Sequence, residues 1–152
     1  MNKDVKSTLS RRELLGSGAI SAGSALTALS APAVHAGGRD LIQLAIVGCG
    51  GRGTGAVLNA LGTRGGPIKL IAMADAYADR LSSCVQNLAK PAGAGMEVPP
   101  DRKFVGFDAY RSAMDQLRPG DIVILTTPPA FRWVHFQYAI RKRLNVFMEK
   151  PV

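Results

Sequence analysis

The chain has few of the residues from which metal centres, disulfide frameworks and nucleic-acid surfaces are built. Its 152 residues include two cysteines, two histidines and 6% aromatic residues. Two cysteines make neither a disulfide framework nor a metal site, so we predict no metal ion and a packing role for Cys49. The net charge is +8, but the basic residues are scattered and lack interleaved aromatic residues, which argues against a nucleic-acid partner. The compact basic cluster at 141–143 is typical of a solvated helix end.

A long, strongly apolar run is also missing near the N-terminus. Residues 14–34 carry no charge, but their glycines, serines and threonines make the run too polar for a membrane anchor, which needs ~20 apolar residues. Before the run, Ser10-Arg11-Arg12-Glu13-Leu14-Leu15 resembles a twin-arginine export signal, and Val34-His35-Ala36 gives a small-residue cleavage pattern. We therefore expect residues 1–36 to be a signal peptide for the twin-arginine export machinery and the mature protein to be periplasmic. An ordinary secretion signal is the alternative.

What the chain does have is a glycine loop directly after an apolar run. The run at 41–47 is typical of a strand buried on both faces, and it opens into a G-x-G-x-x-G pattern at 48–53. In such a pattern the first glycine permits a sharp turn, the second lets a pyrophosphate approach the backbone, and the third lets the next helix pack closely. The helix then presents its positive end to the phosphates. The pattern predicts a dinucleotide site that includes Gly48, Gly50, Gly51, Arg52 and Gly53, and the alternative is a glycine-rich turn without a ligand.

An acidic residue follows the next predicted strand at a suitable distance. Asp75 comes directly after the apolar run 68–74, 22 residues after Gly53. A carboxylate in this place can accept both ribose hydroxyls of the adenosine half and repels a 2′-phosphate, which favours NAD over NADP. The alternative is that Asp75 caps the next helix. Arg80 complicates the preference, since it could reach the adenine face or a phosphate.

The remaining chain alternates strand and helix patterns, which predicts an α/β fold with a Rossmann-type doubly wound parallel sheet over residues 37–152. In the last predicted helix Trp133, Phe136, Gln137 and Ile140 make a mostly apolar face, which we take as the buried one. His135 points away from this face, which makes it a candidate acid–base group, although it sits well inside the helix. The run at 90–103 is predicted to be a loop. The strands are expected at 41–47, 68–74, 104–107, 121–125 and 145–148, and the helices at 54–61, 77–88, 109–117 (capped by Asp108) and 131–143.

The end of the chain carries a more specific motif. A strand followed by Glu149-Lys150-Pro151, after Thr127-Pro128 and a long helix, resembles the Gfo/Idh/MocA oxidoreductases over residues 40–152. The resemblance implies that Lys150 is catalytic, lying near the nicotinamide and the substrate with a pKa lowered by desolvation. It also implies that Thr127 and Pro128 line the ribose–nicotinamide channel and that Glu149 belongs to the cofactor site. Many members follow this turn with histidines, where Arg132 stands here and could bind an anionic group.

The function implied by this resemblance is hydride transfer between the nicotinamide of NAD and a sugar, a cyclic polyol or a related alcohol. An exported glycosidase that uses tightly held NAD is one alternative. Another is an inactive nucleotide-binding fragment, because the second α/β domain that holds substrate in this family is missing from the 152 residues. The resemblance further implies that the full-length form can assemble into oligomers.

Overall fold

The computed structural model describes residues 41–150, so the predicted signal peptide and Pro151 lie outside the described residues. These residues form one five-stranded sheet in the order β3-β2-β1-β4-β5, and every pairing is parallel. The predicted α/β fold with a doubly wound parallel sheet is confirmed. The strands are β1 (Ile42–Val47), β2 (Ile68–Asp75), β3 (Lys103–Val105), β4 (Ile122–Leu125) and β5 (Asn145–Met148).

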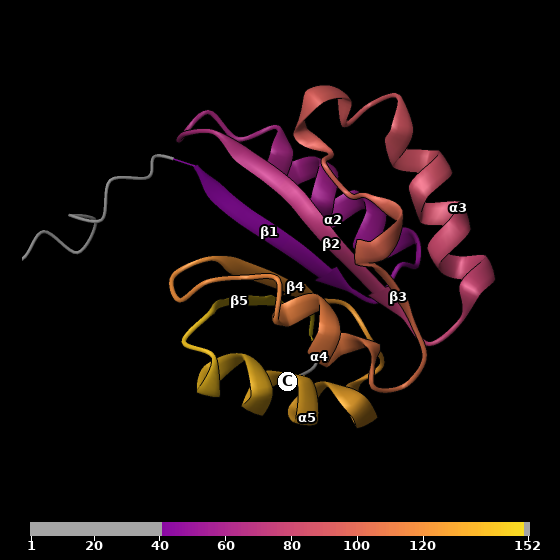
Figure 1. The fold of residues 1–152 in the computed structure, drawn as a ribbon, viewed down its shortest axis with the longest axis vertical. Helices are drawn as coiled ribbons and strands as arrows, with labels where there is room; N and C mark the ends of the chain where they lie inside the picture. The colour runs from indigo at the N-terminus through magenta and orange to yellow at the C-terminus, as the bar shows by residue number, and fades with distance from the viewer. Residues whose placement is uncertain (1–40, 151–152) are drawn as a thin grey trace, which may run out of the picture. The chain divides into compact units, whose positions relative to one another are not determined.

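Helices cover both faces of the sheet (Figure 1). Helices α2 (Gly51–Leu61) and α3 (Ala78–Ala89) pack on one face, and α4 (Ala109–Met114) and α5 (Pro129–Arg141) pack on the other. The central strand β1 serves both layers, because Leu44 and Ile46 face α2 and α3 while Ala45 and Val47 face the opposite layer. This burial on both faces is the physical reason that the strand has a continuous apolar sequence.

Most predicted elements are present, with shifted ends. Helix α2 begins at Gly51 instead of residue 54, so the second half of the glycine pattern is already helical. Strand β3 ends at Val105, because Gly106 turns the chain with a φ of +123°. Asp108 precedes α4 as predicted, but its side chain makes no capping hydrogen bond. The Asp108 carboxylate instead pairs with Arg111, with Oδ1 lying 3.4 Å from Nε.

The segment predicted as a plain loop at 90–103 has local structure. It contains two short 3₁₀ turns, Gly93–Gly95 and Pro100–Arg102. Between them, Met96 forms a parallel bridge with Leu70, and the Glu97 amide donates to the Leu70 carbonyl at 2.8 Å. The segment is therefore attached to β2 at Leu70.

The predicted buried face of α5 is wrong. Trp133 is 61% exposed, Ile140 52% and Phe136 37%, and Gln137 is also exposed. The buried residues of this helix are Arg132, His135 and Ala139. The polar pair can be buried because both side chains find hydrogen-bond partners at the sheet, as described below, so the helix turns its more apolar side outward.

No helix within residues 41–150 is long and apolar enough to cross a membrane.

Candidate functional site

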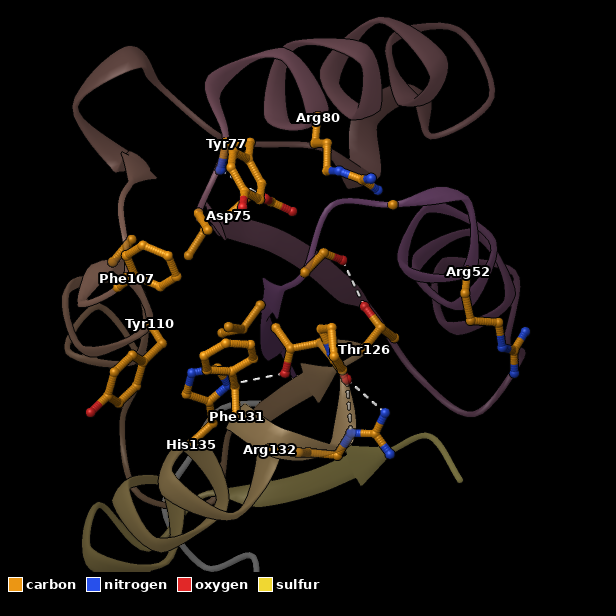
Figure 2. A pocket seen from close by; sticks show the side chains of 18 of the residues that line it. Arg52, Asp75, Tyr77, Arg80, Phe107, Tyr110, Thr126, Phe131, Arg132 and His135 are labelled. Carbon is orange, nitrogen blue, oxygen red and sulfur yellow. Dashed lines mark hydrogen bonds between the residues drawn. The ribbon is translucent and has the colours of Figure 1, made fainter. Parts of the chain in front are cut away.

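A cleft of about 590 Å³ runs along the carboxyl ends of the strands (Figure 2). Strands β1 and β4 are neighbours in the sheet, yet β1 leads on to β2 at one side and β4 leads on to β5 at the other. The cleft therefore lies where the strand order reverses, which is the usual place for a ligand in a doubly wound sheet. Of the residues predicted for the site, eight line it: Gly48, Gly50, Arg52, Asp75, Thr127, Pro128, Glu149 and Lys150.

Gly48 makes the sharp turn that the pattern predicts. Its φ is +102°, and a Cβ there would lie 2.9 Å from the backbone of both Thr126 and Thr127. The Thr126 hydroxyl donates to the Gly48 carbonyl at 2.6 Å. Because the turn is in contact with the end of β4, a side chain at this position would both strain the backbone and separate two strands.

Gly51 and Gly53 do not line the cleft, although both were predicted as site residues. Gly53 lies in the first turn of α2, where a Cβ would overlap the Gly48 carbonyl oxygen and approach Thr126 Oγ1 to 2.7 Å. Its role is the close packing of the helix on the sheet. A Cβ at Gly51 would meet nothing within 4 Å, so this glycine is not required by packing.

Gly50 is different from the other glycines of the loop. It lines the cleft, its φ of −75° suits any residue, and a Cβ would meet only Arg80 Nη1 at 3.8 Å. The space beside its backbone is therefore open to the cleft. Gly50 also directly precedes α2. The first N–H groups of this helix have no hydrogen-bond partner within the helix, and they lie at the end of the helix that borders the cleft.

Asp75 holds the glycine loop in place. Its carboxylate accepts the Cys49 amide at 2.6 Å and the Tyr77 amide at 2.9 Å, and the residue is 8% exposed. The residue that precedes α3 is Tyr77, and no side-chain capping bond is made there. Asp75 is therefore not the N-cap residue itself, but its bond to the Tyr77 amide supports the turn that leads into the helix.

The other end of the cleft is organised by a buried arginine. The Arg132 guanidinium donates to the Thr127 carbonyl through Nε at 3.1 Å and Nη2 at 2.6 Å, and to the Glu149 carbonyl through Nη1. Arg132 is only 5% exposed. These bonds join the ends of β4 and β5, so the guanidinium holds the backbone at Thr127 and Glu149 in place. The sequence suggested an anion-binding role for it.

Glu149 and Lys150 border this end of the cleft. The Glu149 carboxylate pairs with Arg52, which lowers the pKa of Glu149 and links the first turn of α2 to the end of β5. Lys150 lines the cleft with an exposed side chain. The burial on which its predicted catalytic role depends is not provided by residues 41–150.

His135 faces the cleft from α5 and is 7% exposed. Its Nδ1 lies 3.1 Å from Thr127 Oγ1, and its ring lies against Tyr110 with the centroids 4.4 Å apart. Burial lowers the pKa of His135 to about 4, so the imidazole is neutral at pH 7. A neutral imidazole held by a threonine hydroxyl can donate or accept one hydrogen bond toward a ligand.

Several lining residues were not predicted from the sequence. Tyr77, Phe107 and Phe131 are exposed aromatic residues around the cleft, and Phe107 and Phe131 lie with ring centroids 6.1 Å apart. Thr126 and Tyr110 also line it. Their position in the sequence could have identified them, because all but Tyr110 follow the carboxyl end of a strand within a few residues. Within the described chain, no group of three histidine, cysteine or acidic side chains could hold a metal ion.

Comparison with known proteins gives limited results. No family model and no curated protein matches the chain. Among solved structures, an NAD-binding oxidoreductase from Klebsiella pneumoniae matches with 15% identity and a TM-score of 0.40, over 73% of this chain and 35% of that one. A provisionally assigned myo-inositol dehydrogenase from Sinorhizobium meliloti 1021 matches with 14% identity and a TM-score of 0.35, over 71% and 36%. A variant 3-ketoreductase from Actinomadura kijaniata, in complex with TDP-benzene and NADP, matches with 18% identity and a TM-score of 0.36, over 71% and 38%.

The chain thus spans little more than a third of the length of these structures. At such low similarity the matches describe a likeness only. The fold assignment rests on the strand order and the parallel pairings themselves.

Proposed function

We propose that residues 41–150 bind a nicotinamide dinucleotide, NAD in preference to NADP, across the carboxyl ends of β2, β1 and β4. The observation that carries the proposal is the open space beside Gly50, at the start of α2 and on the floor of the cleft. A pyrophosphate there would meet unpaired amide groups and the positive end of the helix dipole. The first turn of α2 contains no acidic residue that would compete for those amides.

The residues around the two ends of the cleft fit the two halves of such a ligand. Asp75 already accepts one amide on each carboxylate oxygen, and a second acceptor position on each oxygen remains for the ribose hydroxyls. Its negative charge favours NAD, because a 2′-phosphate would be repelled. Arg80 is exposed beside this end and supplies a cation that can face the adenine ring.

The nicotinamide half would lie toward Thr127, His135 and Lys150. When bound, the nicotinamide ring supplies the carbon that accepts or gives up a hydride. Lys150 would donate a hydrogen bond to the oxygen of a substrate hydroxyl, and Thr127 would fix the neutral His135 beside it. We propose that the protein is an oxidoreductase of the Gfo/Idh/MocA type, that it acts on a sugar, cyclic polyol or related alcohol, and that it is exported by the twin-arginine route.

The dinucleotide site is tested with two neighbouring glycines. Gly50→Ala places a methyl group where the pyrophosphate would approach, and Gly51→Ala places one in empty space. Isothermal titration calorimetry should show NAD binding by the wild type and by Gly51→Ala, with Gly50→Ala weaker by about tenfold or more. The free energies of unfolding of the three proteins should agree within ~1 kcal/mol. Equal NAD affinity for both variants, or no binding by the wild type, would contradict the proposal.

The chemistry is tested at Lys150. Protein purified from its own cells should reduce NAD with at least one alcohol from a panel of sugars and polyols. Lys150→Ala should lower kcat/KM by roughly 100-fold or more, the range for a residue that assists proton transfer. Lys90→Ala, which changes an exposed lysine after α3 and away from the cleft, is the control. Glycoside turnover without net formation of reduced cofactor would identify the glycosidase alternative, and equal activity of the two variants would remove Lys150 from the mechanism.

Export is tested by native mass spectrometry of the protein from its own cells. A periplasmic species that lacks residues 1–36 and carries the mass of a dinucleotide would support both the export route and the cofactor. A cytoplasmic species that retains those residues would contradict the export proposal and leave the cofactor proposal to calorimetry.

A further inference from the structure

One ion pair joins two elements that border the cleft but are not neighbours in the sheet. Arg52 projects from the first turn of α2 (Figure 2), and its guanidinium pairs with the Glu149 carboxylate at the end of β5. Both residues line the cleft. The pair therefore connects the helix that follows β1 with the end of β5, past the end of β4, which lies between these two strands.

The two partners of this ion pair are held very differently. The Glu149 amide donates to the Leu125 carbonyl at 3.2 Å, and the Glu149 carbonyl accepts from the buried Arg132. The backbone of Glu149 is thus fixed on both sides, and its side chain is only 19% exposed. The Arg52 side chain is 57% exposed. Because an ion pair with so exposed a partner contributes little free energy, the guanidinium can leave the carboxylate at small cost.

A second partner for Arg52 would lie close by in the liganded protein. Gly50, two residues earlier, borders the open space at the start of α2 where the pyrophosphate is proposed to bind. A guanidinium binds phosphate oxygens through paired N–H donors, as it binds a carboxylate. The pyrophosphate and Glu149 would therefore compete for one side chain. The released carboxylate would keep two cationic neighbours, because Arg132 and Lys150 also help to lower the pKa of Glu149.

We propose that Arg52 is a phosphate-binding residue whose availability is limited by Glu149. In the free protein the carboxylate holds the guanidinium, and a bound pyrophosphate replaces the carboxylate as its partner. Each ligand must break the ion pair before it gains the contact with Arg52, so Arg52 strengthens binding while Glu149 weakens it. This inference rests on the proposed function, since it describes the regulation of the same dinucleotide site.

The experiment uses adenosine diphosphate as the probe, because it carries a pyrophosphate but lacks the nicotinamide half. Isothermal titration calorimetry at one ionic strength compares the wild type with Glu149→Gln, Arg52→Gln and the double variant. Glu149→Gln should bind the probe about threefold more tightly, within the range for an exposed ion pair. Arg52→Gln should bind it about threefold more weakly, which is the roughly tenfold gain of a charged hydrogen bond less the cost of breaking the pair.

The double variant separates competition from simple charge repulsion. It should bind the probe as weakly as Arg52→Gln, because without the guanidinium there is nothing for Glu149 to withhold. A carboxylate that only repels phosphate would weaken binding in both backgrounds, so an equal gain from Glu149→Gln with and without Arg52 would overturn the proposal. Glu97→Gln is the matched control, since it breaks an exposed pair with Lys69 outside the cleft and should leave the affinity unchanged.

Titrations with NAD distinguish a failure of this inference from a failure of the proposed function. If the wild type binds NAD and adenosine diphosphate, but Glu149→Gln does not bind the latter more tightly, Glu149 does not limit Arg52 and the dinucleotide site still stands. If none of the four proteins binds either ligand, the proposed function fails and this inference fails with it.

Discussion

Helices α2 and α5 both begin at the carboxyl end of a central strand, and both border the cleft. The role of α2 can be predicted from its own residues, because a glycine, which has no side chain, indicates a sharp turn or a close approach at its own position. The role of α5 depends on residues far away, since Arg132 bonds the carbonyl of Glu149 and His135 packs on Tyr110. A motif that constrains the backbone can therefore be recognised locally. A polar side chain is buried only when residues that are distant in the sequence form hydrogen bonds or ring contacts with it.

The largest effect is expected at the closest contact of α2. Gly53→Ala would force a methyl group into the Gly48 carbonyl, which the turn at Gly48 holds in place. We expect a loss of ~3 kcal/mol or more in the free energy of unfolding, at or above the upper range for overpacking. Gly51→Ala, two residues away in the same turn and with open space around it, should be neutral or stabilising by up to ~1 kcal/mol. Urea unfolding of both variants makes the comparison, and equal stabilities would show that α2 does not pack as described.

The next effect is expected at the buried arginine of α5. Arg132→Met keeps the apolar stem but removes the donors to the carbonyls of Thr127 and Glu149. The loss should be about 2–4 kcal/mol, because two partly buried acceptors lose a charged donor. Arg132→Lys should recover only part of it, since one ammonium cannot reproduce the planar fork of a guanidinium. These stabilities come from the same urea titrations.

Arg141→Met is the matched control in the same helix. Arg141 is exposed and lies over the Tyr138 ring, 5.6 Å from its centroid. Its replacement should change stability by no more than ~0.5 kcal/mol, as is usual for a surface residue. If Arg132→Met were as mild as Arg141→Met, the buried guanidinium would not hold the two strand ends together.

A pH-dependent effect is expected at His135. Its pKa falls from 6.5 in the unfolded chain to about 4 in the folded protein. Between these values the unfolded chain binds a proton that the folded protein does not, so the free energy of unfolding decreases as the pH is lowered through this range. The decrease should be about 1.5 kcal/mol between pH 6.5 and about pH 5, because the slope reaches 1.36 kcal/mol per pH unit only once the unfolded histidine is fully protonated.

His135→Gln is the variant that isolates this contribution. Glutamine can still bond the Thr127 hydroxyl but does not titrate, so its stability should change much less over the same interval. The lowered pKa values of Asp115 and Glu149 affect both proteins alike and act mainly at lower pH. Parallel curves for the variant and the wild type, obtained from urea titrations across the pH range, would show that His135 is not buried in the neutral form.

The two helices also differ in how much of their structure the sequence predicts. The doubly wound parallel sheet, the turn at Gly48 and the acid at Asp75 follow from apolar runs and motif spacing. The inward turn of His135 does not, because apolar periodicity ranks the faces of a helix without regard to polar partners. Gly53 packs the helix on the sheet as the motif predicts, although it does not line the cleft, whereas Gly51 neither lines the cleft nor is required by packing. The motif thus predicts the neighbourhood of the site more reliably than the contact made by each residue.

The smallest effect is expected on the outer side of α5. Trp133 is the single tryptophan of the chain and is 61% exposed. Its fluorescence should resemble that of an indole in water, and Trp133→Gln should change the free energy of unfolding by no more than ~0.5 kcal/mol. Blue-shifted emission together with a loss of ~2 kcal/mol or more, measured on the full chain, would mean that this side is covered. The original prediction of an apolar buried face would then hold in the intact protein, and α5 would be buried on both sides as β1 is.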